Sequence, residues 1–240
     1  MRSPPALVVI AALVACGGGT PPPPAEPEHA QHGQHGQHGQ KGQHAGPSDH
    51  FHHSFDDAET WAAVFDDPAR DEWQKPDELV AALKLAPDAR VADVGAGTGY
   101  FAVRLARAVP QGKVYAIDIE PDMIRYMGER AQREGLANLA AVLGTADDAR
   151  IPEPVDVVLV VDTYHHIADR TAYFRRLAGS LRPGGRVVIV DFTADSPIGP
   201  PVEHRLSVGR VVAELGDAGY VETARHDFLP NQYVVELTRR

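Results

Sequence analysis

The most informative segment of the chain is Asp93-Val94-Gly95-Ala96-Gly97-Thr98-Gly99. It follows a short apolar run at residues 91–94 and opens a segment, residues 98–109, whose apolar residues recur at helical spacing. Glycines at such a strand-to-helix turn let the backbone bend tightly and approach a ligand closely. The spacing is G-x-G-x-G, and Tyr100 stands where nicotinamide-binding folds carry their third glycine. The run therefore predicts a ligand-binding loop that departs from the dinucleotide fingerprint.

Outward from this loop, strands and helices alternate along the chain. Apolar and β-branched runs predict strands at residues 91–94, 113–119, 139–143, 155–161, 186–192, 220–228 and 232–238. Helical spacing predicts helices at residues 98–109, 121–135, 171–181 and 208–218, with a sharp turn at residues 182–185 before the fifth strand. This alternation is typical of an α/β fold. We expect a doubly wound, mainly parallel seven-stranded sheet with an antiparallel C-terminal edge hairpin, preceded by a disordered N-terminal region.

Asp118 ends the second predicted strand, about 20 residues beyond the glycine loop. An acid at the end of that strand is placed to accept hydrogen bonds from both ribose hydroxyls of a nucleoside. Taken alone, an Asp at a strand end is more often a helix cap or a solvated charge. Its pairing with the glycine loop favours the ligand-binding interpretation.

With these two motifs the chain resembles the class I S-adenosylmethionine-dependent methyltransferases. Segments 144–152, 155–167 and 181–185 match the superfamily's next motifs in the right order, and the likeness covers roughly residues 79–240. It implies a Rossmann-like methyltransferase domain with S-adenosyl-L-methionine as its cofactor. In the third region either Asp147, which has the better spacing, or Asp148 meets the adenine amino group. The cofactor-binding residues that the resemblance implies are Asp93, Gly95, Ala96, Gly97, Thr98, Gly99, Asp118, Ile119, Asp147, Asp148 and Asp162.

The loop after the fourth predicted strand carries the catalytic candidates. In this fold the acceptor lies at the end of that strand, and a hydroxyl or amine acceptor is helped by a general base. His165 and His166 have the pKa range for that role, and Tyr164 is a weaker candidate. Alternatively, one histidine packs structurally or caps the next helix. We expect Asp162 to face the methionine part of the cofactor, Asp191 to be structural or solvated, and no metal site in the domain.

Residues 51–78 precede this domain and hold both tryptophans of the chain. In the superfamily such N-terminal helices commonly lie over the cofactor as a lid. Two interpretations stay open here. Either Trp61 and Phe65 form a stripe that packs the helix onto the core, or the segment is a lid that also contacts substrate through Arg70, Trp73 or Gln74.

Composition limits the partners of the chain. It has 240 residues, 43% of them hydrophobic, enough for one domain with a packed core. Its net charge is −10 and falls almost entirely on residues 51–240, which argues against nucleic acid as a partner. The single cysteine, Cys16, excludes a disulfide framework and a multi-cysteine zinc site. Because the predicted domain has no cysteine, a thiol-based metalloid methyltransferase is disfavoured.

The N-terminus has a different character. Residues 1–15 fit a signal peptide, because Arg2 precedes an apolar run at residues 6–15 that is too short to span a bilayer. The sequence ending in Cys16 resembles a bacterial lipobox, which implies an acylated Cys16, membrane contact through the lipid only, and the periplasmic side of a bacterial envelope. The alternatives are an ordinary signal peptide, a mispredicted start codon, or an unused signal and a cytoplasmic protein.

Residues 16–50 follow as a Pro-rich and then His/Gly/Gln-rich linker. Of the 12 histidines in the chain, 8 lie between His29 and His53. The composition offers little to bury, so it predicts a disordered tether. An alternative is weak divalent-metal binding by the imidazoles.

Together these features predict an S-adenosylmethionine-dependent methyltransferase acting on a small molecule, with the acceptor atom open. The alternative is a catalytically silent methyltransferase-like lipoprotein that carries a ligand or a metal. The glycine spacing disfavours a nicotinamide oxidoreductase. One conflict stands: S-adenosylmethionine is made in the cytoplasm, whereas a lipoprotein signal sends the domain across the membrane.

Overall fold

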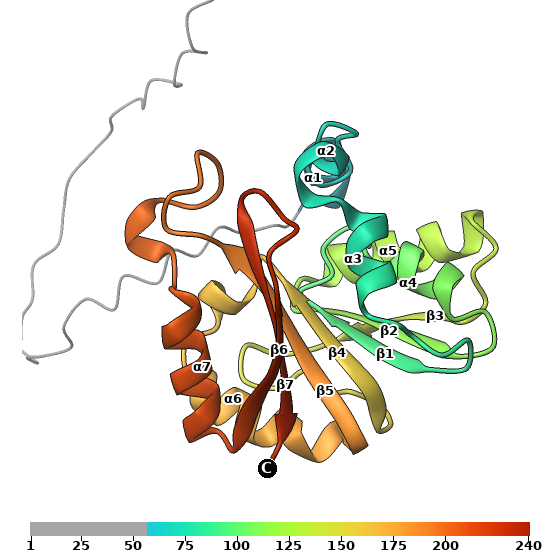
Figure 1. The fold of residues 1–240 in the computed structure, drawn as a ribbon. Helices are drawn as coiled ribbons and strands as arrows, with labels where there is room; N and C mark the ends of the chain where they lie inside the picture. The colour runs from blue at the N-terminus through green and yellow to red at the C-terminus, as the bar shows by residue number, and fades with distance from the viewer. Residues whose placement is uncertain (1–56) are drawn as a thin grey trace, which may run out of the picture. The chain divides into compact units, whose positions relative to one another are not determined.

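A computed structural model describes residues 57–240 of the chain (Figure 1). Seven strands form one sheet in the order β3-β2-β1-β4-β5-β7-β6. The strands are β1 (Arg90–Val94), β2 (Lys113–Asp118), β3 (Leu139–Leu143), β4 (Val155–Val161), β5 (Leu181–Phe192), β6 (Tyr220–His226) and β7 (Gln232–Arg239). The first five strands run parallel, and β7 pairs antiparallel with both β5 and β6. The predicted seven-stranded α/β sheet with an antiparallel edge hairpin is confirmed.

Helices cover both faces of the sheet (Figure 1). The helices are α1 (Ala58–Phe65), α2 (Arg70–Gln74), α3 (Pro76–Ala82), α4 (Ala102–Ala108), α5 (Pro121–Arg133), α6 (Arg170–Leu177) and α7 (Val208–Asp217). One apolar core lies between the sheet and α3, α4 and α5, and a second lies between the sheet and α6 and α7. Three short 3-10 turns complete the elements: η1 (Tyr164–His166), η2 (Ala178–Ser180) and η3 (Val202–His204).

Several predicted boundaries differ from the structure, and two of them do so for a clear local reason. The helix after the glycine loop begins at Ala102, not at residue 98, because Gly99 has φ +90° and its N–H closes a turn onto Ala96 O at 2.9 Å. Residues 182–185, predicted as a turn, lie within β5. There Leu181 pairs with Val155 and Arg186 with Val157, so the four residues between bulge out of register.

Several predictions fall on residues 1–56, outside the described part of the chain. They are the signal peptide, the acylated Cys16, the His-rich linker and the first six residues of the predicted lid segment. Between residues 57 and 240, no helix has the length and apolar character needed to cross a membrane.

Candidate active site

The glycine loop turns sharply at the carboxyl end of β1. Gly95, Gly97 and Gly99 have φ values of +75°, +54° and +90°, a region that side-chain-bearing residues rarely adopt. The N–H groups of Gly95 and Ala96 both donate to Ile117 O at 2.9 Å, which ties the loop to β2. A Cβ added at Gly95 would overlap the side chain of Thr163, just beyond β4. The loop therefore lies packed between the ends of β2 and β4.

Asp118 lies at the end of β2, beside this loop. Its carboxylate accepts from the N–H of Gly97 at 2.8 Å and from that of Glu120 at 3.1 Å. Burial raises the pKa of Asp118, against the lowering effect of these hydrogen bonds. Two apolar side chains stand exposed next to it: Ile119 follows it, and Leu143 is its register partner on β3. A carboxylate flanked by open apolar surface suits the ribose and base of a nucleoside.

Two buried polar atoms at the loop lack a hydrogen-bond partner, namely Oδ2 of Asp93 and Oγ1 of Thr98. Both residues are almost fully buried. Burial and the neighbouring charge of Asp118 raise the pKa of Asp93 to about 7. Buried polar groups are normally paired, so two unpaired atoms in one loop mark a place where a polar ligand fits. The loop, Asp118 and these atoms together fit the donors and acceptors of an adenosyl cofactor.

The two acids predicted to meet adenine lie in the turn after β3. Asp147 is exposed, and its carboxylate accepts from Thr145 Oγ1 at 2.7 Å and lies 3.8 Å from Arg176. Asp148 is half-buried, and its carboxylate accepts from the N–H of Arg150 at 2.8 Å. The choice between the two carboxylates therefore stays open.

Asp162, directly after β4, is held by side chains from distant segments. It has φ +54°, and its carboxylate accepts from Gln74 Nε2 at 2.9 Å and from Gln232 Nε2. Arg70 Nη2 lies 3.5 Å from the same carboxylate. Burial raises the pKa of Asp162 to about 6, and the charge of Arg70 opposes that rise. Gln74 is fully buried and Gln232 nearly so, whereas the Asp162 side chain keeps 22% of its surface exposed.

The segment α1–α2 lies over these loops. The ring of Phe65 comes to 3.2 Å from the position that a Cβ on Gly97 would take, and Phe65 stacks on Trp61 at 5.4 Å between centroids. Trp73 on α2 packs against Phe192 at the end of β5, with 5.8 Å between centroids. Trp61 and Phe65 are only half-buried. The segment thus contacts the glycine loop and residues at the ends of β4 and β5.

His165 and Asp191 form a buried pair at the ends of β4 and β5. His165 Nδ1 lies 3.0 and 2.9 Å from the two carboxylate oxygens of Asp191, and the side chains are 6% and 1% exposed. Because a carboxylate only accepts, Nδ1 carries the proton and Nε2 keeps a free lone pair when the ring is neutral. Burial lowers the pKa of His165, but the hydrogen bond and charge of Asp191 outweigh it and leave the pKa raised.

The other two catalytic candidates lie differently. The ring of His166 stands beside that of His165, with 4.2 Å between centroids. Tyr164 is fully buried in the core under α6 and α7, and its hydroxyl donates to Glu214 at 2.9 Å. The structure therefore brings the two histidines together and leaves Tyr164 in a structural hydrogen bond.

Sequence reasoning missed the partner of His165. Asp191 was expected to be structural or solvated, yet it is buried and bonded to the candidate base. The signal for it was available: β4 and β5 are adjacent parallel strands, so residues that follow them share one edge. Gln232, a hairpin residue, carried no such signal, because its contact with Asp162 spans 70 residues.

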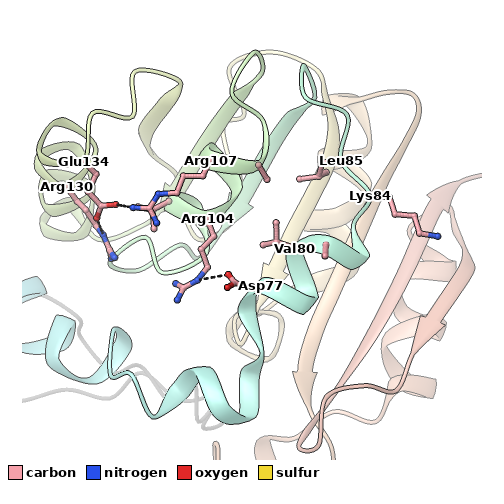
Figure 2. Close-up of a pocket in the computed structure, with 11 residues that line it drawn as sticks. Asp77, Val80, Lys84, Leu85, Arg104, Arg107, Arg130 and Glu134 are labelled. Carbon is pink, nitrogen blue, oxygen red and sulfur yellow. Dashed lines mark hydrogen bonds and ion pairs between the residues drawn. The ribbon is translucent and has the colours of Figure 1, made fainter.

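A separate pocket lies between α3, α4 and α5 (Figure 2). Its volume is about 660 Å³, and its lining residues include two ion pairs, of Arg104 with Asp77 and of Arg107 with Glu134. None of the predicted site residues lines it. Within residues 57–240 there is also no cluster of three or more His, Cys, Asp or Glu side chains that could hold a metal ion.

Comparison with known proteins agrees with this geometry. The model of a family described as "methyltransferase domain" matches residues 85–216. A 27-O-demethylrifamycin SV methyltransferase of Amycolatopsis mediterranei is 34% identical over 127 residues, 51% of this chain and 46% of that protein. An uncharacterized methyltransferase of Mycobacterium tuberculosis is 35% identical over 144 residues, 59% of this chain and 54% of that protein. The chain thus spans about half the length of the curated relatives it matches.

Solved structures give the same result over more of the chain. An S-adenosylmethionine-dependent methyltransferase from Aquifex aeolicus superposes with a TM-score of 0.69 at 27% identity, over 75% of this chain and 97% of that one. A magnesium protoporphyrin IX methyltransferase from Synechocystis, solved with bound S-adenosylhomocysteine, superposes with a TM-score of 0.60 at 19% identity, over 78% and 96% of the two chains. The second likeness concerns the fold alone.

Proposed function

Because the chain belongs to the methyltransferase domain family and its cofactor is S-adenosylmethionine, we propose that it methylates a hydroxyl group of a small-molecule acceptor. The observation that carries the proposal is the buried His165–Asp191 pair at the ends of β4 and β5. A hydroxyl must lose its proton as it is methylated, and this pair is built to accept one.

The chain's own residues supply the cofactor site in this proposal. Asp118 takes the ribose hydroxyls, and Ile119 lies against the base. The unpaired Asp93 Oδ2 and Thr98 Oγ1 meet the chain that links ribose to the amino-acid end, which the glycine backbone lets approach closely. Asp147 or Asp148 meets the adenine amino group, and Asp162 faces the cationic end. When bound, S-adenosylmethionine supplies an electrophilic methyl group on a sulfonium.

His165 acts as the general base. Asp191 holds the Nδ1–H, so the imidazole presents the Nε2 lone pair and takes the acceptor's proton there. Asp191 also stabilises the imidazolium that results, which favours proton transfer from a weakly acidic hydroxyl. In this fold the lid segment α1–α2 excludes water from the site through Trp73 and Phe65.

A small-molecule acceptor is supported by two observations. The chain carries a net charge of −10, which disfavours a nucleic-acid acceptor. The Amycolatopsis relative is named for methylation of a hydroxyl on a small natural product.

The test is a methyl-transfer assay with methyl-labelled S-adenosylmethionine and a panel of phenols, aliphatic alcohols and matched amines. We expect label to appear in a hydroxyl compound with the wild-type chain and to fall at least 100-fold with His165→Gln, as loss of a general base predicts. Cofactor binding should persist in that variant. Binding without product for every acceptor would instead favour the silent ligand-carrying alternative, and methylated amines without methylated hydroxyls would contradict the proposed acceptor class.

The location of the chain is a separate part of the proposal. From the sequence before residue 17 we infer export and acylation of Cys16, which would leave the domain tethered through the His-rich linker on the periplasmic side. Mass spectrometry of the mature N-terminus tests it: an acylated Cys16 is expected, and an unprocessed Met1 would place the protein in the cytoplasm with its cofactor. The same preparation, titrated with Zn²⁺, tests whether the linker histidines bind metal.

A further inference from the structure

Arg70 is a cation among the carboxylates that lie at the carboxyl ends of the parallel strands. It lies on α2, its side chain is 16% exposed, and its guanidinium stacks over the ring of Tyr100 at 4.2 Å. Nη1 donates to Phe65 O at 2.8 Å, and Nε donates to Gln74. Nη2 reaches Asp162 at 3.5 Å, the longest of its three hydrogen bonds. The guanidinium can therefore leave Asp162 while its other contacts hold α2 in place.

The surroundings of Arg70 are strongly acidic. Asp93, Asp118 and Asp162 end three neighbouring strands of the sheet, β1, β2 and β4. Among the described Arg and Lys side chains, Arg70 is the one within ion-pair distance of Asp162. Its charge also lowers the pKa of Asp93 and of Asp162, against the effect of burial. Arg70 is thus the chain's own counter-charge for carboxylates at the glycine loop.

The sheet order places the cofactor's positive charge at the same point. This step rests on the proposed function. With ribose at Asp118 on β2, the rest of the cofactor crosses the glycine loop of β1 toward β4, because the strands lie in the order β2-β1-β4. The sulfonium end then approaches Asp162, where Arg70 already lies. Two cations beside one carboxylate repel each other, so one of them must give way.

We propose that Arg70 is an exchangeable counter-ion of Asp162: it yields to the sulfonium of S-adenosylmethionine and stays when S-adenosylhomocysteine, which lacks that charge, occupies the site. Arg70 therefore sets how strongly the chain discriminates between the charged cofactor and its uncharged product. With Arg70 present, the cofactor must displace an existing ion pair and the product need not. Arg70 therefore weakens the binding of S-adenosylmethionine and leaves the binding of S-adenosylhomocysteine unchanged.

The experiment measures dissociation constants of the full chain for both compounds by calorimetry. In Arg70→Met we expect S-adenosylmethionine to bind about tenfold more tightly, about 1.4 kcal/mol at 25 °C. Binding of S-adenosylhomocysteine should change less than twofold. Arg70→Lys keeps the charge and should keep the wild-type ratio of the two constants. Arg104→Met is the matched control, because Arg104 stacks on the same Tyr100 ring at the same 4.2 Å but pairs with Asp71, so its ratio should stay unchanged.

Asp162→Asn tests the same exchange from the other side. It removes the group for which the two cations compete, so the affinity for S-adenosylmethionine should fall while that for S-adenosylhomocysteine holds. Both variants are judged by the ratio of two constants on one protein, so any general loosening of the lid cancels.

Three outcomes would overturn the proposal. In the first, Arg70→Met lowers the affinity for both compounds by the same factor, which would mean that Arg70 binds a group that the two compounds share. In the second, neither constant moves. In the third, the wild-type chain binds neither compound, and the proposed function then fails together with the exchange. Wild-type binding with an unchanged ratio in Arg70→Met defeats the exchange alone.

Discussion

The proposed active site lies where the parallel strands of the sheet end, and its two halves are built in different ways. In the cofactor half, formed by β1, β2 and β3, backbone groups do most of the holding, as where Gly97 N–H donates to Asp118 across 21 residues. In the acceptor half, formed by β4, β5 and β7, side chains hold one another across the chain. Asp162 is bonded to Gln74 over 88 residues and to Gln232 over 70.

This difference separates what is fixed by local geometry from what is open to change. A loop with three positive φ angles tolerates few residues, so its conformation is set by the backbone. A cluster of side chains can be altered one residue at a time without disturbing the strands that carry it. Substitutions in the glycine loop should therefore abolish cofactor binding. Those in the acceptor half should change rate or selectivity while cofactor binding persists, weakened only where Asp162 or its partner Arg70 changes the balance of charge.

Gly95→Ala should have the largest effect and tests the cofactor half. A Cβ there overlaps Thr163, and φ is +75°, so the loop must move. We expect cofactor affinity to fall more than about 100-fold, with a loss of roughly 2–4 kcal/mol in the free energy of unfolding from strain and overlap. Calorimetry measures the cofactor affinity, and denaturant titration measures the free energy of unfolding. The matched control is Gly135→Ala, also at positive φ but with open space around it, which should cost only ~1 kcal/mol and leave binding intact.

His165→Gln and Asp191→Asn test the acceptor half. Loss of the base should lower kcat by about 10²–10³-fold with the cofactor affinity unchanged. Since the base must be neutral, the wild-type rate should rise with pH through the pKa of His165, which lies above its ordinary value. Asp191→Asn removes the charge that raises this pKa and should move the rise to lower pH. The exposed Asp195→Asn should leave the pH profile unchanged. If cofactor affinity falls with kcat in either variant, the two halves are not separable.

The parts of the fold and of the candidate site that could be predicted are those set by local sequence pattern. The loop at residues 95–99 and Asp118 were predictable, because a positive φ demands glycine and a strand end has a definite place on a parallel sheet. The strands at residues 139–143 and 155–161 were predicted with their observed bounds. The His165–Asp191 bond and the Gln232 contact were not predicted, because nothing in a strand's own sequence tells which buried side chain it will meet across the sheet.

Asp93→Asn tests the cofactor half through stability. The pKa of Asp93 is raised to about 7, so the folded state holds a proton that the unfolded chain has already lost. Wild-type stability should therefore fall as pH rises from about 4 to about 7. Asn avoids this loss and should raise the free energy of unfolding by about 2–4 kcal/mol at pH 8, and by less at pH 5. Denaturant titration at both pH values measures this, with the exposed Asp88→Asn as control. A pH-independent difference would contradict the buried, proton-holding carboxyl.

Tyr164→Phe should have the smallest effect and marks where the acceptor half ends. The change removes one hydrogen bond to Glu214, which Arg170 continues to hold at 2.6 Å, so we expect a loss of about 1 kcal/mol in the free energy of unfolding. Because the hydroxyl faces the core under α6 and α7, kcat should stay within about twofold of wild type, well below the effect of losing a general base. Tyr220→Phe is the matched control, since it removes another buried hydroxyl, bonded to Phe174 O at 2.8 Å. If Tyr164→Phe alone lost kcat tenfold, with a stability like that of the control, the Tyr164 hydroxyl would take part in the reaction. The acceptor half would then extend into the core.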